Sequence, residues 1–92
     1  MMSVRAHVIV TGAVQGVSFR QYTRMKALEN GVTGWVRNLP DGRVEAVFEG
    51  KKEDVEKMIE FCKMGPPNAY IGNLNIKWED FKGETNRFEI RY

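Results

Sequence analysis

Hydrophobic and polar side chains alternate with a period of two in four of the five segments that are predicted to be strands, the exception being residues 33–38. Such alternation is typical of β-strands that bury one face and expose the other. The second and third segments flank Pro40-Asp41-Gly42, whose residue types favour a tight turn, so these two segments are predicted to form a hairpin. The predicted strands cover residues 5–11, 33–38, 43–49, 74–79 and 88–92.

Two further segments are predicted to be helices. Residues 52–63 carry apolar side chains at positions i, i+3, i+4 and i+7, namely Val55, Met58, Ile59 and Cys62. The run Gly65-Pro66-Pro67 then ends this helix, because proline cannot continue it. Residues 19–30 contain good helix formers, and Ser18 followed by Gln21 has the spacing of a capping box, which predicts a helix that starts at Ser18.

The order of these elements is β-α-β-β-α-β with a terminal strand. It packs most simply as an α+β ferredoxin-like sandwich, in which an antiparallel sheet carries both helices on one face. A chain of 92 residues suits one hydrophobic core, so we expect a single domain over residues 1–92. Because this fold serves many functions, the function has to be read from the loops.

Composition narrows the classes of protein to which the chain can belong. It has a formal net charge of +2, with 42% hydrophobic and 28% charged residues, and no apolar run approaches the length of a membrane span. The N-terminus lacks the features of a secretory signal, and a single cysteine excludes an internal disulfide. We therefore expect a cytoplasmic protein with no membrane attachment. Basic and acidic residues are balanced and scattered, which disfavours a dedicated nucleic-acid binder.

The segment from Gly12 to Arg20 reads Gly-Ala-Val-Gln-Gly-Val-Ser-Phe-Arg and joins a predicted strand to a predicted helix. Its glycines allow unusual backbone angles, and unpaired N–H groups at the start of the helix would face the loop. The spacing fits neither a Walker loop nor a dinucleotide fingerprint. It could form a nest in which N–H groups from Gln15 to Arg20 point at phosphate oxygens, with Arg20 adding a bidentate contact. Taken alone, a tight turn with a solvated arginine is the commoner structure.

A second candidate is Asn38, which ends the predicted strand Gly34-Trp35-Val36-Arg37-Asn38 just before the hairpin turn. We expect this strand to lie close to the first one, with Asn38 on the same face as Gly34 and Val36. An amide can both donate and accept hydrogen bonds, so it could hold a water molecule in one orientation. The alternative, an asparagine that only initiates the turn, is commoner by propensity.

Both segments resemble the signature motifs of a known family. Gly-Ala-Val-Gln-Gly-Val-Ser-Phe-Arg at 12–20 and Gly-Trp-Val-Arg-Asn-Leu-Pro-Asp-Gly-Arg-Val-Glu at 34–45 are similar to the two motifs of the acylphosphatases. The resemblance covers the whole chain, including Gly65-Pro66-Pro67 and the ending Phe-Glu-Ile-Arg-Tyr. Two motifs at the right separation are more specific than either one.

The resemblance implies an enzyme that hydrolyses the carboxyl-phosphate bond of a small-molecule acylphosphate to a carboxylate and inorganic phosphate. It further implies that the enzyme needs no cofactor and forms no covalent intermediate. By the same resemblance, Arg20 is the phosphate-binding catalytic arginine and Asn38 positions the attacking water. The backbone amides that complete the phosphate cradle belong to Gln15, Gly16, Val17, Ser18 and Phe19. We expect a monomer, with broad specificity for the acyl group because the loop recognises phosphate.

The chemistry agrees with motifs that lack His, Asp and Glu. An acylphosphate leaves as a carboxylate, which is a weak base, so no general acid is needed and catalysis reduces to positioning and electrostatics. A phosphate oxygen of the substrate is the expected proton acceptor. We expect no metal at Asp41 and Glu45, where a third ligand is lacking, and we expect His7 and Cys62 to be structural residues.

Two other functions are compatible with a ferredoxin-like fold. An RNA-binding module would show aromatic side chains exposed on the central strands, in a Lys/Arg-Gly-Phe-x-Phe-like pattern that is missing here, and Trp35 and Trp78 suit core or cover positions. A domain of a larger carbamoyl-transferring maturation protein could keep the family fold without turnover. The presence of both Arg20 and Asn38 favours an active free-standing enzyme.

Overall fold

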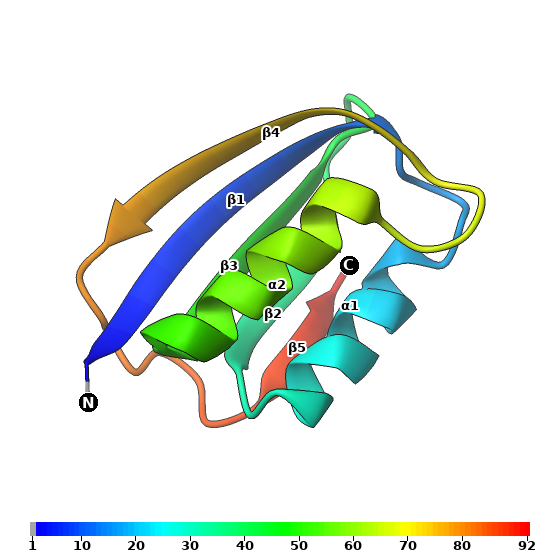
Figure 1. Cartoon of the computed structure of the whole chain (residues 1–92). Helices are drawn as coiled ribbons and strands as arrows, with labels where there is room; N and C mark the ends of the chain where they lie inside the picture. The colour runs from blue at the N-terminus through cyan, green and yellow to red at the C-terminus, as the bar shows by residue number, and fades with distance from the viewer. Residues whose placement is uncertain (1) are drawn as a thin grey trace.

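The computed structural model describes residues 2–92, which form five strands and two helices (Figure 1). The predicted order of elements is confirmed, and the second predicted strand has the predicted bounds. Neither helix in the described part of the chain is long and apolar enough to cross a membrane. The elements are β1 (Ser3–Ala13), α1 (Phe19–Glu29), β2 (Thr33–Asn38), β3 (Val44–Lys51), α2 (Lys52–Met64), β4 (Tyr70–Glu79) and β5 (Phe88–Arg91).

The strands form one sheet in the order β4-β1-β3-β2-β5, and both helices cover the same face of it (Figure 1). This arrangement confirms the predicted ferredoxin-like sandwich. The sheet is mixed and not wholly antiparallel, because β5 pairs in parallel with β2 while all other neighbours are antiparallel. After β4 the chain passes to the opposite edge of the sheet, where β5 runs in the same direction as β2.

The core lies between the sheet and the two helices, and it contains the apolar positions of the predicted patterns. On β1 it contains every second residue, Ala6, Val8 and Val10, all fully buried. The apolar stripe of α2 packs against this face, and Cys62 within it is fully buried. Burial raises the pKa of the Cys62 thiol to about 12, as expected for an inert structural cysteine.

Strand β1 continues two residues beyond the predicted end at Thr11, because Gly12 and Ala13 also pair with β4. The register shifts between Thr11 and Gly12, which marks a β-bulge. Gly12 has a φ of 145°, and a side chain there would overlap the Tyr70 carbonyl oxygen. The close approach of the two backbones requires glycine at this position. Because Gly12 and Ala13 pair with β4, that strand begins at Tyr70, earlier than the start predicted at residue 74.

A buried carboxylate holds the loop that leads into β5. Glu49, fully buried on β3, accepts hydrogen bonds from the backbone N–H groups of Lys82, Gly83 and Glu84 at 2.7, 3.3 and 3.2 Å. The Arg5 guanidinium lies 3.5 Å from the same carboxylate and also pairs with Glu79. These bonds satisfy a charge that would otherwise be costly to bury, and they fix the path of the loop.

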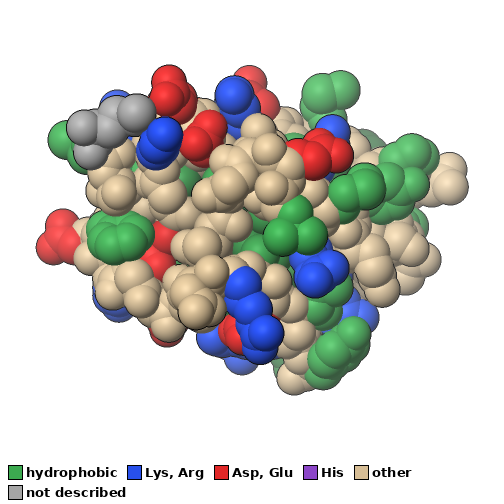
Figure 2. Space-filling model, turned by 90° about the horizontal axis from the view of Figure 1, so that it is seen from below, with side chains coloured by type: hydrophobic (Ala, Val, Ile, Leu, Met, Phe, Trp, Pro, Cys, Tyr) green, Lys and Arg blue, Asp and Glu red, His purple; other side chains and the backbone are tan. Residues whose placement is uncertain are grey.

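Acidic and basic side chains are interspersed on the face of the molecule shown in Figure 2. Blue side chains gather most closely in the lower central part of this view, and most of the red side chains lie above them.

Candidate active site

Five of the seven predicted site residues meet in a pocket of about 220 Å³ at one end of the sheet. The pocket lies where the loop after β1 enters α1 and where β2 ends. Arg20 and Asn38, which are 18 positions apart in the sequence, line it together. The lining residues are Val14, Gly16, Ser18, Phe19, Arg20, Gln21 and Asn38. None of these side chains is a carboxylate, an imidazole or a thiol.

The loop is anchored at both ends by buried side chains. Val14 and Phe19 are almost fully buried in the core, whereas residues 15–18 between them are partly or fully exposed. Within this exposed part, Gly16 has a φ of 76° and Ser18 a φ of 59°. A left-handed conformation is uncommon for serine, so the loop holds Ser18 in a costly geometry next to the pocket.

The capping box predicted for Ser18 and Gln21 is wrong. Ser18 precedes α1, but its side chain makes no capping hydrogen bond. An N-cap residue normally has extended backbone angles, which aim its side-chain oxygen at the N–H groups of the first turn, and the left-handed angles of Ser18 do not. The backbone N–H groups in the first turn of α1 therefore donate no hydrogen bond to the side chain of Ser18.

The backbone N–H groups of residues 15–20 are free to bind a ligand. Among residues 2–92, none of these groups donates any of the hydrogen bonds in turns, loops and caps. They lie at the N-terminal end of α1, where the helix dipole favours negative charge. The loop therefore offers several unpaired donors and a favourable potential to an anion. Val17 and Gln15 belong to this loop although their side chains do not line the pocket.

Arg20 supplies the only cationic side chain that lines the pocket. In the part of the chain that the structure describes, its guanidinium forms no ion pair with a carboxylate, so its charge remains available to an anion. The guanidinium lies 4.8 Å from the centre of the Tyr92 ring, within the range of a cation–π contact. Nothing in the local sequence around Tyr92 indicated this contact, because it joins the last residue to the first turn of α1.

Asn38 reaches the pocket from a strand that is not adjacent to β1. The expected proximity of the two strands is wrong, because β3 lies between β1 and β2. Instead, the loop after β1 extends to the turn that joins β2 to β3. The side chain of Asn38 forms no hydrogen bond with the other residues described here, so its amide is free to bind a water molecule or a ligand.

The side chain of Gln15 joins the loop to this turn. Its Nε2 donates hydrogen bonds to the carbonyl oxygens of Leu39 and Arg43 at 2.8 and 2.9 Å. These two residues close the turn, since the Leu39 N–H also bonds to the Arg43 carbonyl at 2.8 Å. Gln15 was predicted to act only through its backbone, so its side-chain contacts are a feature that the sequence did not reveal.

The ionisable side chains near Asn38, those of Arg37 and its partner Glu45, point away from the pocket. On the opposite face of the sheet, Glu45 accepts hydrogen bonds at 2.6 Å from both His7 and Arg37. Burial alone would raise the pKa of Glu45, but these bonds lower it below its ordinary value. Because His7 and Glu45 are satisfied by each other, both are structural, as predicted for His7. No group of three or more His, Cys, Asp or Glu within residues 2–92 could hold a metal ion.

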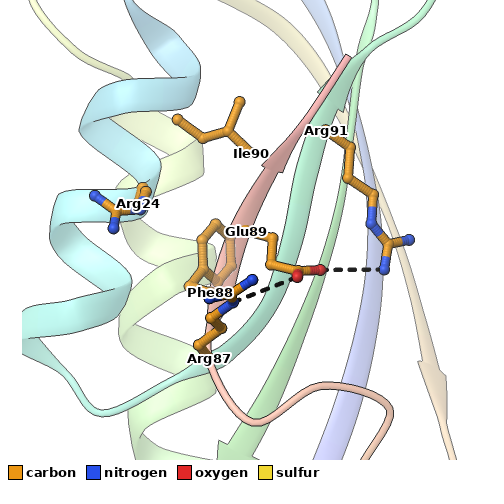
Figure 3. A pocket seen from close by; sticks show the side chains of 6 residues that line it. All are labelled: Arg24, Arg87, Phe88, Glu89, Ile90 and Arg91. Carbon is orange, nitrogen blue, oxygen red and sulfur yellow. Dashed lines mark hydrogen bonds and ion pairs between the residues drawn. The ribbon is translucent and has the colours of Figure 1, made fainter.

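A second hollow, of about 330 Å³, lies beside β5 and differs from the loop pocket in that a carboxylate lies among its arginines (Figure 3). It contains three arginines, yet Arg87 and Arg91 both pair with Glu89, at 3.5 and 3.4 Å. Figure 3 shows Glu89 between these two guanidinium groups and Arg24 projecting from α1 away from them. Although this hollow is larger than the loop pocket, two of its three arginines share the single carboxylate of Glu89, and it has no loop of free N–H groups.

Comparison with known proteins gives a consistent result over the whole chain. The protein-family model for acylphosphatase matches residues 6–90 of this chain. The acylphosphatase of Pelotomaculum thermopropionicum is 52% identical over 92 residues, which is 100% of both chains. The crystal structure of an acylphosphatase from Bacillus subtilis is 34% identical, with a TM-score of 0.93 over 97% of this chain and 99% of that one. T. kodakarensis HypF is also 34% identical, with a TM-score of 0.83, but only 12% of that chain is covered.

Proposed function

The chain belongs to the acylphosphatase family, and we propose how its loop pocket hydrolyses an acylphosphate to a carboxylate and inorganic phosphate. The observation that carries the proposal is that Arg20 and Asn38 line one pocket with a loop whose N–H groups are unpaired. These are the two roles that the reaction requires: binding of the phosphoryl group and placement of the attacking water.

The phosphoryl group binds in the loop. The N–H groups of Gln15, Gly16, Val17, Ser18 and Phe19 donate to its oxygens, and Arg20 adds a bidentate charged contact. Donors held rigidly before the reaction stabilise the charge of the transition state without reorganising. The unusual backbone angle of Ser18 supports this role, because strained residues cluster where backbone groups must point in one direction.

Asn38 holds the nucleophilic water in line with the bond that breaks. Its amide oxygen accepts a hydrogen bond from the water, so that a lone pair of the water oxygen is directed at phosphorus. The water proton passes to a phosphate oxygen of the substrate, which needs no protein base. The phosphorus–oxygen bond to the acyl group breaks, and the electron pair leaves with the carboxylate.

The pocket lining supports a mechanism without a metal, a cofactor or a general acid. None of its seven lining residues is an acid, a histidine or a cysteine. A carboxylate leaving group is stable without protonation, so the reaction does not require a general acid. Arg20 and the loop amides supply the positive potential that a metal ion provides in many other phosphoryl-transfer enzymes.

The cellular setting of the enzyme is part of the same proposal. We place it in the cytoplasm as a monomer that binds no nucleic acid; one observation supports the compartment and another the absence of nucleic-acid binding. Cys62 is buried as a free thiol. Trp35, the aromatic side chain of β2, is only 8% exposed and lies beneath Arg37 and Arg91, so its ring is not available for stacking on bases.

Release of phosphate from benzoyl phosphate tests the proposal. We expect Arg20→Ala to lower kcat/KM by about 10²- to 10³-fold, the range for loss of one preorganised donor. Arg20→Lys should recover little of this, because a lysine cannot form the bidentate contact. Asn38→Ala should lower kcat with little change in KM, since the water is absent from the binding step. A chelator should have no effect.

Each result can contradict a different part of the mechanism. Absence of turnover by the wild-type protein would contradict hydrolysis altogether. Loss of activity with a chelator would contradict the metal-free mechanism, and normal turnover by Asn38→Ala would contradict the role of Asn38. Thermal denaturation of each variant distinguishes these outcomes from loss of the fold.

A further inference from the structure

An open hollow of about 370 Å³ adjoins the loop pocket on the surface of α1. It is lined by Ser18, Gln21, Tyr22 and Met25, and it shares Ser18 and Gln21 with the loop pocket. Asn38 lines the loop pocket but not this hollow. The two depressions therefore meet at Ser18 and Gln21.

The far part of the hollow offers apolar surface to a ligand. Gln21 and Tyr22 lie four and three positions before Met25 on α1, so these three side chains share one face of the helix, and Ser18 precedes its first turn. Met25 is 45% exposed although it is apolar, and the Tyr22 ring lies on the same face. An adaptable thioether and an aromatic ring suit contact with aliphatic or aromatic groups. No charged side chain lines the hollow.

In-line attack determines where the acyl group must lie. The water and the leaving carboxylate occupy opposite sides of the phosphorus atom. Asn38 holds the water at one side of the loop pocket, so the acyl group must leave on a side away from Asn38. At Ser18 and Gln21 the loop pocket meets the hollow on α1, which Asn38 does not line. On the basis of the proposed function, we propose that Tyr22 and Met25 form an acyl subsite that favours acylphosphates with aromatic or medium-length aliphatic acyl groups.

A second depression extends the apolar surface beyond Tyr22. A groove of about 480 Å³ between α1 and α2 is also lined by Tyr22, together with Phe61, Met64 and Pro66. An acyl chain too long for the first hollow therefore has further apolar contacts beside it. The groove is also lined by Lys26, Lys57 and Glu60, so its apolar part is the surface around Tyr22, Phe61 and Met64. Small acyl groups, such as acetyl or carbamoyl, are too short to use the apolar surface of either depression. The subsite thus adds a preference that the phosphate loop alone does not provide.

The experiment compares kcat/KM for acetyl, butyryl, octanoyl and benzoyl phosphate. Each methylene that leaves water is worth roughly fourfold in binding, so partial contact predicts that wild type prefers benzoyl over acetyl phosphate by about tenfold. Met25→Ser should reduce this ratio by about threefold, whereas Met25→Leu, which keeps the apolar surface, should preserve it. Leu28→Ser is the matched control: Leu28 is 56% exposed on the same helix but is not among the residues that line either depression.

Competitive inhibition by inorganic phosphate separates the subsite from the loop. In Met25→Ser the inhibition constant of phosphate should equal that of wild type, because phosphate does not reach Met25. The proposed acyl subsite is contradicted if Met25→Ser leaves the benzoyl-to-acetyl ratio of kcat/KM unchanged, which includes an equal fall in kcat/KM for both substrates. It is also contradicted if Leu28→Ser lowers this ratio as much as Met25→Ser does. If no acylphosphate is hydrolysed, acetyl phosphate included, the proposed function fails and the subsite with it.

Discussion

Replacing Gln15 with alanine tests whether the loop and the β2–β3 turn must be held together for catalysis. The side chain of Gln15 donates two hydrogen bonds, to Leu39 and Arg43, and these are the side-chain bonds that join the loop after β1 to the turn following Asn38. In Gln15→Ala both bonds are lost, while the backbone N–H groups of the loop and the side chain of Asn38 remain. The variant therefore alters the relative position of two intact halves of the site.

The size of the effect can be worked out from these two bonds. A neutral hydrogen bond contributes about 0.5–1.5 kcal/mol net, and solvent can reach both bonds here, so we expect the variant to lose about 1 kcal/mol of unfolding free energy. A domain with a stability of about 5 kcal/mol or more stays folded after such a loss. A displacement of about 1 Å between reacting groups can nevertheless cost up to about 10²-fold in rate. We therefore expect kcat to fall about tenfold in a folded protein.

The assay combines urea denaturation with the kinetics of benzoyl phosphate hydrolysis. If Gln15 acts by positioning, kcat falls while the inhibition constant of inorganic phosphate stays near that of wild type, because the loop amides still bind phosphate. Asn86→Ala, which removes an exposed amide from the loop before β5, is the control and should change neither value. The reasoning is refuted if Gln15→Ala loses stability as expected but keeps its wild-type kcat.

Three further predictions concern stability and the buried thiol. Glu49→Ala should lower the free energy of unfolding in urea by about 3 kcal/mol, because three backbone N–H groups and Arg5 lose a buried charged partner; a loss below about 1 kcal/mol would contradict this. The pKa of Glu45 is lowered below its ordinary 4.5 in the folded protein, so its contribution is present above that pH and is lost as the pH falls through the folded pKa. Thermal denaturation between pH 7 and pH 3 should therefore show a smaller loss of stability in Glu45→Gln than in wild type, and equal losses would count against the pairing. Since burial raises the pKa of Cys62 to about 12, a disulfide reagent at pH 8 should label it in urea but not in the native protein; rapid native labelling would show that it is accessible.

Local patterns were sufficient to predict most of the fold, since each of them reflects burial of one face. The stripe of α2 and the alternation on β1 identify core residues that are fully buried in the structure. The failures occur where a distant element determines the local conformation. Tyr70 begins β4 because it pairs with Ala13 across the bulge, and no periodicity near Tyr70 indicates this. Ser18 has the residue type of an N-cap, but the loop places its backbone in a left-handed conformation.

For the site, the sequence by itself determined the chemical groups and the loop that holds them. Residue type sets charge, hydrogen-bonding capacity and preferred backbone angles, so Arg20, Asn38 and the glycine-containing loop could be recognised before any contact was known. Only the tertiary structure decided which groups meet. Asn38 reaches the loop although β3 separates its strand from β1, and Gln15 makes the connection between them. The stacking of Tyr92 on Arg20 and the hollow beside Tyr22 depend in the same way on packing between elements, which local sequence does not encode.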